Sequence, residues 1–213
     1  MGLFDFFRNK KKLNSLEPEE SPPPTIEEDV VFFPELNFVF NENTESLKNV
    51  FFPALSIRLS VINKDWGDGF IHLIQFNEDP YNRETVKYYN EYCKDNMLSF
   101  SLEHGKYTFN TDLKFLDVTE DWRRYLEETK ISYLSSKAKY ENTGEAFNLS
   151  DFQLGGEPGW WQSDSTPLDP DGNPMTFITE METHPFCPDS CDKKIFLFYS
   201  HKHKLVVQLY QMT

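Results

Sequence analysis

The sequence has few cysteines and no long apolar run. Its three cysteines, Cys93, Cys187 and Cys191, are too few and odd in number for a disulfide framework, which predicts a reducing, cytoplasmic location. Apolar residues precede the basic ones at the N-terminus, the reverse of a secretory signal peptide. No apolar run approaches the roughly 18 residues of a membrane span, so we expect no integral membrane segment.

Lysine and arginine are scarce as well. The chain has 213 residues, 21 of them basic and 35 acidic, with a formal net charge of −14. A protein that holds nucleic acid must neutralise phosphates with basic side chains, so we expect no nucleic-acid partner. Aromatic residues are abundant, with 20 Phe, 10 Tyr and 4 Trp, which is typical of a folded domain and not of an acidic disordered chain.

Three catalytic or phosphate-binding motifs are missing from the sequence. It contains no Gly-x-Ser-x-Gly elbow, no Gly-x-x-x-x-Gly-Lys loop and no Gly-x-Gly-x-x-Gly turn. We therefore assign no catalytic residue, and whether the protein is an enzyme stays open, with the balance against it.

The N-terminal region differs in composition from the rest of the chain. Residues 1–12 carry a net charge of +3, while residues 13–29 hold six acids, four prolines and no base. We predict that residues 1–29 form a disordered Pro-rich tail, basic and then acidic, and that residues 30–213 form one domain. An alternative for the Phe-rich first twelve residues is contact with a membrane surface.

Residue patterns predict the elements of this domain. Runs of β-branched and aromatic residues predict strands at 30–40, 55–62, 70–76, 98–102, 106–109, 175–181, 195–199 and 205–210, the last two joined as a hairpin by 200–204. Apolar residues at three- and four-residue spacing predict helices at about 81–96 and at about 120–141, the second with Thr119 as N-cap. The expected fold class is α+β, a single domain of mainly antiparallel β-sheet with two amphipathic helices.

One segment has no lysine or arginine at all. From Tyr140 to Asp192, 53 residues contain eleven acids and no base, and they include a Gly-Gly-Glu-Pro-Gly-Trp-Trp-Gln sequence. We predict an acidic, Trp-containing surface that attracts a basic partner. The alternative is a solvated loop with incidental charge, in which one tryptophan enters the core and the other anchors the loop. The expected partner-binding residues are Glu157, Trp160, Trp161, Gln162, Asp164, Asp169 and Asp171.

This segment resembles the YwqG-like family of uncharacterised bacterial proteins. The resemblance rests on the Gly-Gly-x-Pro-x-Trp type sequence at 155–162, on Pro174-Met175-x-Phe177 and on the aromatic strand at 195–199, mainly within residues 150–213. It implies an α+β scaffold without an assigned reaction. Many members have a Cys-x-x-Cys pair in the turn where this chain has Asp169 and Asp171, and often a glutamine where it has Glu180.

Two groups of residues could bind a metal. His184, Cys187 and Cys191 lie within eight residues, and His201 or His203 could supply a fourth ligand, so a structural zinc is one interpretation and a plain loop with two thiols is the other. We expect no other cofactor.

The second group is the acidic turn. Asp169, Asp171, Asn173 and Glu180 match positions of a calcium-binding loop, but Pro174 stands where that loop needs glycine. An Asp-Pro-Asp-Gly turn is the better interpretation, with a looser cation site on Asp169 and Asp171 left open.

Two functions of different classes follow. The first is a non-catalytic cytoplasmic interaction protein that binds a basic protein partner through the acidic surface, in its most specific form an immunity protein against a basic toxin. The second is a small-ligand or metal-dependent hydrolytic enzyme. The sequence leaves the oligomeric state open.

Overall fold

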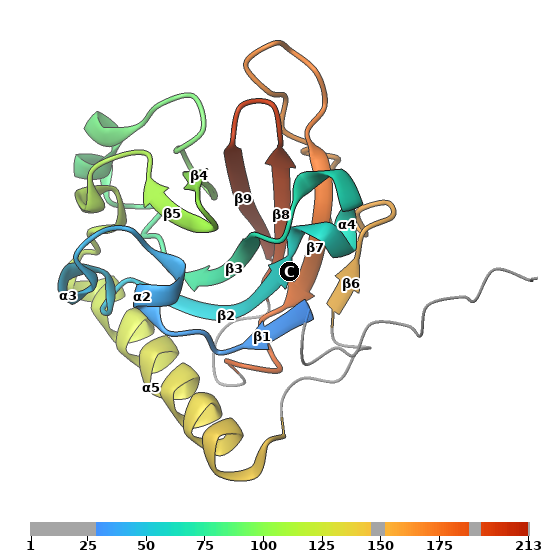
Figure 1. Ribbon diagram of the computed structural model, residues 1–213. Helices are drawn as coiled ribbons and strands as arrows, with labels where there is room; N and C mark the ends of the chain where they lie inside the picture. The colour runs from blue at the N-terminus through green and yellow to red at the C-terminus, as the bar shows by residue number, and fades with distance from the viewer. Residues whose placement is uncertain (1–28, 146–151, 188–192, 213) are drawn as a thin grey trace, which may run out of the picture.

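The computed structural model describes residues 29–145, 152–187 and 193–212, and it contains two antiparallel sheets packed against each other (Figure 1). The smaller sheet has the order β1-β2-β3, with bounds Val30–Phe32, Phe51–Arg58 and Phe70–Phe76. The larger has the order β5-β4-β9-β8-β7-β6, with bounds Lys106–Phe109, Met97–Glu103, Leu205–Met212, Lys193–Ser200, Thr176–Glu182 and Phe152–Leu154. The expected α+β fold with mainly antiparallel sheet is confirmed.

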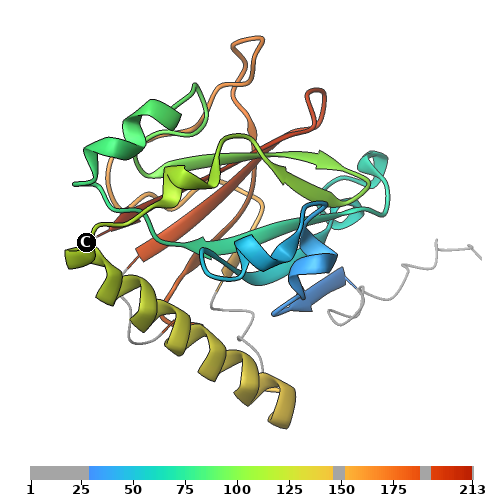
Figure 2. The same ribbon diagram turned by 90° about the vertical axis from the view of Figure 1, so that its left-hand side faces the viewer.

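One long helix, α5 (Glu120–Thr143), lies at the edge of these sheets, and its predicted position is confirmed (Figures 1 and 2). Thr119 stands at its N-cap position, but its hydroxyl donates to Asp79 and does not cap the helix. No helix in the described ranges combines the length and apolar character needed to cross a bilayer. The short helices are α2 (Leu36–Val39), α3 (Thr44–Leu47) and α4 (Leu59–Ile62), and the 3-10 segments are η1 (Lys64–Trp66), η2 (Arg83–Tyr88) and η3 (Leu113–Leu116).

The helix expected at 81–96 is wrong. Only the 3-10 segment η2 forms, because Tyr89 turns extended and the side chain of Asn90 then accepts the N–H groups of Tyr92 and Cys93. An asparagine that bonds its own following backbone in this way competes with helix formation.

The strand expected at 30–40 ends early, and the strand expected at 55–62 is shifted. β1 stops at Phe32 because Phe33 adopts a positive φ of 46° and Pro34 follows. β2 begins four residues earlier than expected, at Phe51, and the apolar residues after Arg58 form α4.

Both faces of the larger sheet are buried. In β8, Ile195, Leu197 and Tyr199 belong to the main core between the sheets, while Phe196 and Phe198 belong to a second apolar cluster on the outer face. This alternation follows from the two-residue period of a strand. The outer face therefore needs a cover of its own, and the segment between β6 and β7 supplies it.

Candidate functional site

Residues 155–175, here called the cover loop, connect β6 to β7 and pack on the outer face of the larger sheet. The Trp160 ring stacks on Phe196 with centroids 4.4 Å apart and lies nearly parallel to Phe198 at 5.9 Å. Trp160 therefore anchors the loop on the sheet. Trp161, the next residue, is half-buried.

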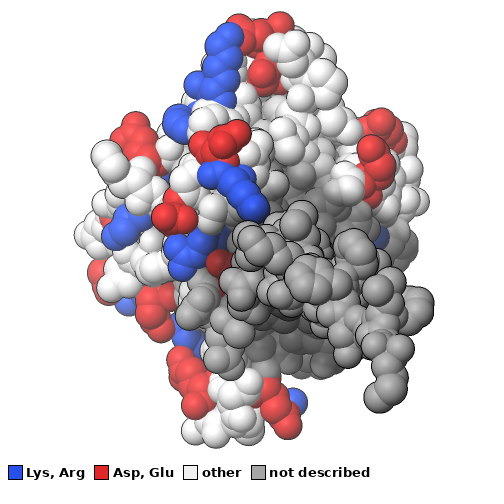
Figure 3. Space-filling model, turned by 45° about the vertical axis from the view of Figure 1, so that its right-hand side comes forward, with Lys and Arg blue, Asp and Glu red and all other residues white. Residues whose placement is uncertain are grey.

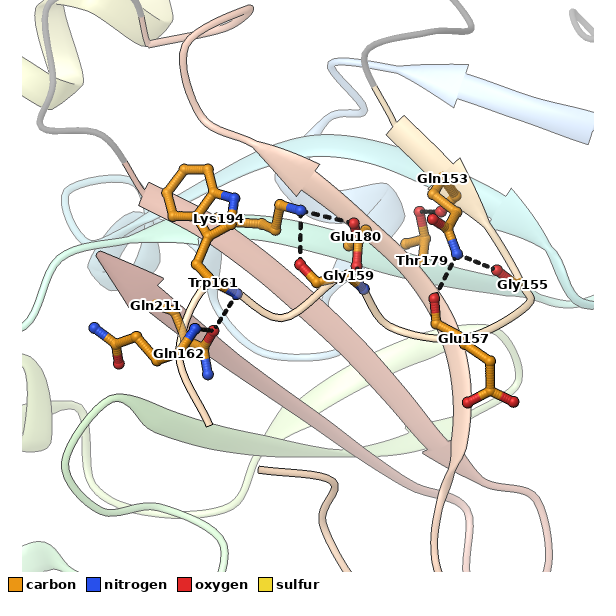
Figure 4. A network of polar contacts seen from close by, with 10 residues as sticks. All are labelled: Gln153, Gly155, Glu157, Gly159, Trp161, Gln162, Thr179, Glu180, Lys194 and Gln211. Atoms are coloured by element: carbon orange, nitrogen blue, oxygen red, sulfur yellow. Dashed lines mark hydrogen bonds and ion pairs between the residues drawn. The ribbon is translucent and has the colours of Figure 1, made fainter. Parts of the chain in front are cut away.

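An ion pair with little solvent exposure holds the first part of the cover loop (Figure 4). Lys194 Nζ on β8 lies 2.8 Å from Glu180 Oε1 on β7, and the two side chains are 12% and 9% exposed. The same ammonium donates to the Gly159 carbonyl at 2.9 Å, and the Gly159 N–H donates to Glu180 Oε2 at 2.6 Å. A Cβ at position 159 would lie 2.7 Å from Glu180 Oε1, so this close approach favours glycine.

Two glutamines fix the rest of this stretch (Figure 4). Gln153 on β6 donates from Nε2 to two loop carbonyls, at 2.9 and 2.7 Å. Gln211 on β9 accepts two loop N–H groups at 2.9 Å each and donates to a loop carbonyl at 2.9 Å. Because side chains from the four strands β6 to β9 satisfy the backbone between residues 155 and 163, this part of the loop is held in one conformation. The loop groups bonded in this way belong to Gly155, Glu157, Trp161, Gln162 and Ser163.

The segment from Tyr140 to Asp192 contains no lysine or arginine, but lysines from other parts of the chain lie beside it in the structure. Lysines from outside it form three ion pairs with its acids: Lys139 with Glu145, Lys194 with Glu180, and Lys202 with Asp171. At the top of the molecule, basic and acidic side chains accordingly lie next to each other (Figure 3). The acids of this segment that form no ion pair with any described residue are Glu141, Glu157, Asp164 and Glu182. Asp151, Asp189 and Asp192 lie outside the described residues.

Asp164 keeps its charge on the surface of the loop. It accepts hydrogen bonds from the N–H and the hydroxyl of Thr166, at 2.9 and 2.7 Å, and these bonds hold its pKa below the usual value. Its carboxylate is therefore both exposed and locally fixed.

The predicted Asp-Pro-Asp-Gly turn is confirmed. The Gly172 N–H donates to the Asp169 carbonyl at 2.8 Å, and Asp169 Oδ1 accepts the N–H groups of Asp171 and Asn173. The bond from Asn173 contributes most to holding the pKa of Asp169 below its usual value.

Next to this turn, the oxygens of Asp169 and Asp171 and the imidazole of His203 lie within 4.8 Å of one another. Two carboxylates and an imidazole are compatible with a divalent cation. Lys202, however, also pairs with Asp171 and lowers the pKa of that carboxyl. Asp169, Asp171 and His203 therefore give only weak support to a bound zinc ion, and these ligands differ from the cysteines expected from the sequence.

The expected zinc ligands are not brought together in the described residues. His184 is exposed, the Cys187 thiol is buried against a backbone carbonyl of α5, and Cys191 lies outside the described residues. The carbonyl of Thr183 accepts the N–H of Cys187, and the N–H of Thr183 donates to Lys193, the first residue of β8. His201, in contrast, directly follows the last residue of β8. At about 3.3 Å per residue, the length of β8 therefore separates Cys187 from His201 by about 23 Å.

A serine and a histidine form a bond of the kind that hydrolases use, but in the core. Ser56 Oγ lies 2.6 Å from His72 Nδ1, and His72 Nε2 lies 2.8 Å from the Gly105 carbonyl. Since a carbonyl only accepts, Nε2 carries the proton and Nδ1 accepts from the serine. Both side chains are 0% exposed, and burial lowers the pKa of His72 to about 4. A substrate cannot reach this pair, so it is structural.

Sequence reasoning missed Gln153, Lys194 and Gln211, which position the loop. A signal was available: Lys194 has the same strand parity as Phe196 and Phe198, so it lies on a buried face, where a lysine needs an acidic partner such as Glu180.

The comparisons with known proteins add no relative. No family model matches the chain, and neither curated proteins nor solved structures gave a match. The resemblance to the YwqG-like family therefore stays a prediction.

Proposed function

We propose that this protein is an interaction protein that binds a basic protein partner through the cover loop. The observation that carries the proposal is the fixed backbone of the loop, which presents the unpaired carboxylates of Glu157 and Asp164 from a rigid frame. Fixed charges favour association because little conformational entropy is lost on binding. Trp161, half-buried beside Lys194, adds an aromatic surface that can contact the stem of a basic side chain.

The hydrolytic alternative has less support. Its best nucleophile–base pair, Ser56 and His72, is enclosed in the core, and Cys187 and His201 are separated by the length of β8. The Cys93 thiol is free and buried, which suits the proposed cytoplasmic location. In the most specific form of the proposal, the partner is a basic toxin and this chain is its immunity protein.

Binding to basic proteins tests this proposal. A panel of small proteins with isoelectric points above about 9 is titrated against the full chain at about 0.15 M ionic strength, where only close charges interact strongly. We expect a panel member to bind, and we expect Glu157→Gln with Asp164→Asn to raise its Kd about tenfold, since both changes remove charge and keep shape.

The matched control removes two charges from α5, at the opposite end of the molecule. Asp121 and Glu127 are exposed there, and Asp121→Asn with Glu127→Gln likewise removes two negative charges from the total. Equal weakening by both double variants would show that net charge alone drives binding. That result, or no binding by any panel member, contradicts the proposal.

A further inference from the structure

A pocket of about 180 Å³ lies between the start of β2 and the C-terminal half of α5, far from the cover loop. Its walls are mostly apolar, with Pro34, Phe51, Phe52 and Pro53 on one side and Leu134 on the other. Leu134 is 51% exposed although its neighbours in the pocket are apolar. The pocket can therefore take an apolar side chain.

The rim of this pocket is basic in a chain that is strongly acidic. Lys48, Lys130 and Lys137 line it against one acid, Glu35, whereas the whole chain has 21 bases and 35 acids. Within the described part of the chain, the three ammonium groups bond surface partners: Glu45, Asn49 and Glu35. The Lys48–Glu45 pair is exposed on both sides and the Glu35 partner of Lys137 is 71% exposed, and contacts with such exposed partners contribute little energy. An apolar pocket with such a rim fits a segment in which leucine is flanked by acids.

We propose that residues 13–20 of this same chain dock in the pocket, with Leu16 inside it and the acids that follow facing the three lysines. This stretch reads Leu-Asn-Ser-Leu-Glu-Pro-Glu-Glu and contains no base. Its acids Glu17, Glu19 and Glu20 match the lysines in number and oppose them in charge. The acidic tail then has a binding site on its own domain.

The length of the connecting chain suits this contact. Asp29, the first described residue, bonds Arg58 at the end of β2, whereas the pocket lies at the start of β2, about 20 Å away at about 3.3 Å per residue. The 13 residue steps from Asp29 back to Leu16 include four prolines, and as an extended Pro-rich chain at about 3.1 Å per residue they reach up to about 40 Å. The connecting chain is therefore long enough to bring residues 13–20 to the pocket, which a tethered segment requires.

The same tail provides an internal control. Glu27 and Glu28 are only one or two residues from Asp29 and reach at most about 7 Å beyond it, too short for the pocket. Removing their charges changes the tail charge but not the proposed contact.

Zero-length carbodiimide crosslinking of the full chain tests the proposal, because it joins a carboxylate to an amine only where the two meet. We expect crosslinks from Glu17, Glu19 or Glu20 to Lys48, Lys130 or Lys137, well above those to the exposed reference lysines Lys64 and Lys87. Leu16→Ser should lower their yield about tenfold, as expected for losing one buried leucine, and Leu134→Glu should do the same from the domain side. Glu27→Gln with Glu28→Gln should leave the yield unchanged.

Mixing chains with and without ¹⁵N separates the possible occupants. Crosslinks within one chain support the proposal. Mixed-isotope crosslinks would assign the pocket to the tail of a second copy and overturn it, and so would crosslinks spread evenly over pocket and reference lysines. Because Leu16 lies in the tail and Leu134 is half exposed, neither substitution removes a core residue, and urea unfolding confirms that each variant is folded.

Discussion

Replacing Glu180 with alanine is expected to lower the free energy of unfolding by about 3 kcal/mol, because it leaves Lys194 charged and unpaired in a nearly closed site. The substitution also removes the acceptor of the Gly159 N–H. Urea unfolding at pH 7 measures the loss. Faster chymotrypsin cleavage at Trp160 and Trp161 would show that it arises in the cover loop.

A double-mutant cycle gives the control for this prediction. Lys194→Met combined with Glu180→Ala should cost less than the sum of the single changes, since no lone charge is left behind. Glu84, whose ion pair with Lys87 is exposed, provides the matched surface substitution, and Glu84→Ala should cost under about 0.5 kcal/mol. If Glu180→Ala costs no more than Glu84→Ala, the ion pair does not hold the loop.

Replacing Glu78 with glutamine is expected to stabilise the protein at pH 8. Glu78 is 7% exposed, and burial raises its pKa to about 7, partly opposed by a hydrogen bond from Tyr210 and by the charge of Lys193. A pKa raised from 4.5 to about 7 corresponds to about 3 kcal/mol of stability that is present below pH 4.5 and lost as the pH rises through 7. Glutamine keeps an acceptor for Tyr210 and has no charge to bury.

The gain should therefore depend on pH in a defined way. Urea unfolding should show Glu78→Gln and the wild type to be equally stable near pH 4, and the variant to be more stable by about 3 kcal/mol at pH 8. Glu127→Gln, an exposed change on α5, should have little effect at either pH. A variant less stable than the wild type at pH 8 would mean that the ionised carboxylate is held by Lys193, and it would contradict the prediction.

In the Glu78→Gln variant, the pH dependence of stability that His72 contributes should become visible, because it has the opposite sign to that of Glu78. Its pKa is lowered from 6.5 to about 4, so its contribution to stability is full above pH 6.5 and is lost as the pH falls through 4. In the wild type, between pH 4.5 and 6.5, the stability contributed by Glu78 falls with rising pH while the stability contributed by His72 rises. Without Glu78, the stability should rise over that range.

Much of the fold could be predicted from local patterns. β3 and β5 have the predicted bounds, and α5 and β7 to β9 differ from them by two residues or fewer. The start of β2 at Phe51 was missed, and it includes Pro53, a residue unusual in a central strand, which the register shift between Pro53 and Leu55 accommodates. The run at 30–40 was predicted as one strand, but the positive φ of Phe33 ends β1, and Leu36–Val39 form α2.

The candidate site was predicted in location but not in structure. The lack of bases pointed to the cover loop, and the turn at Asp169 to Gly172 was read from its residues. The side chains that hold the loop come from far along the chain, Gln211 lying 50 residues from Trp161. Spacing within the segment cannot reveal such partners, because the pairing of β7, β8 and β9 brings them together.

Carboxylate footprinting of the full chain with a bound basic protein tests the proposed binding face most directly. Each acid is labelled at a rate that falls when a partner covers it. The cover loop as binding face predicts strong protection of Glu157 and Asp164 and unchanged labelling of Asp121 and Glu127 on α5. Protection confined to α5 or to the acidic tail, with Glu157 and Asp164 labelled as fast as in the free protein, would contradict it.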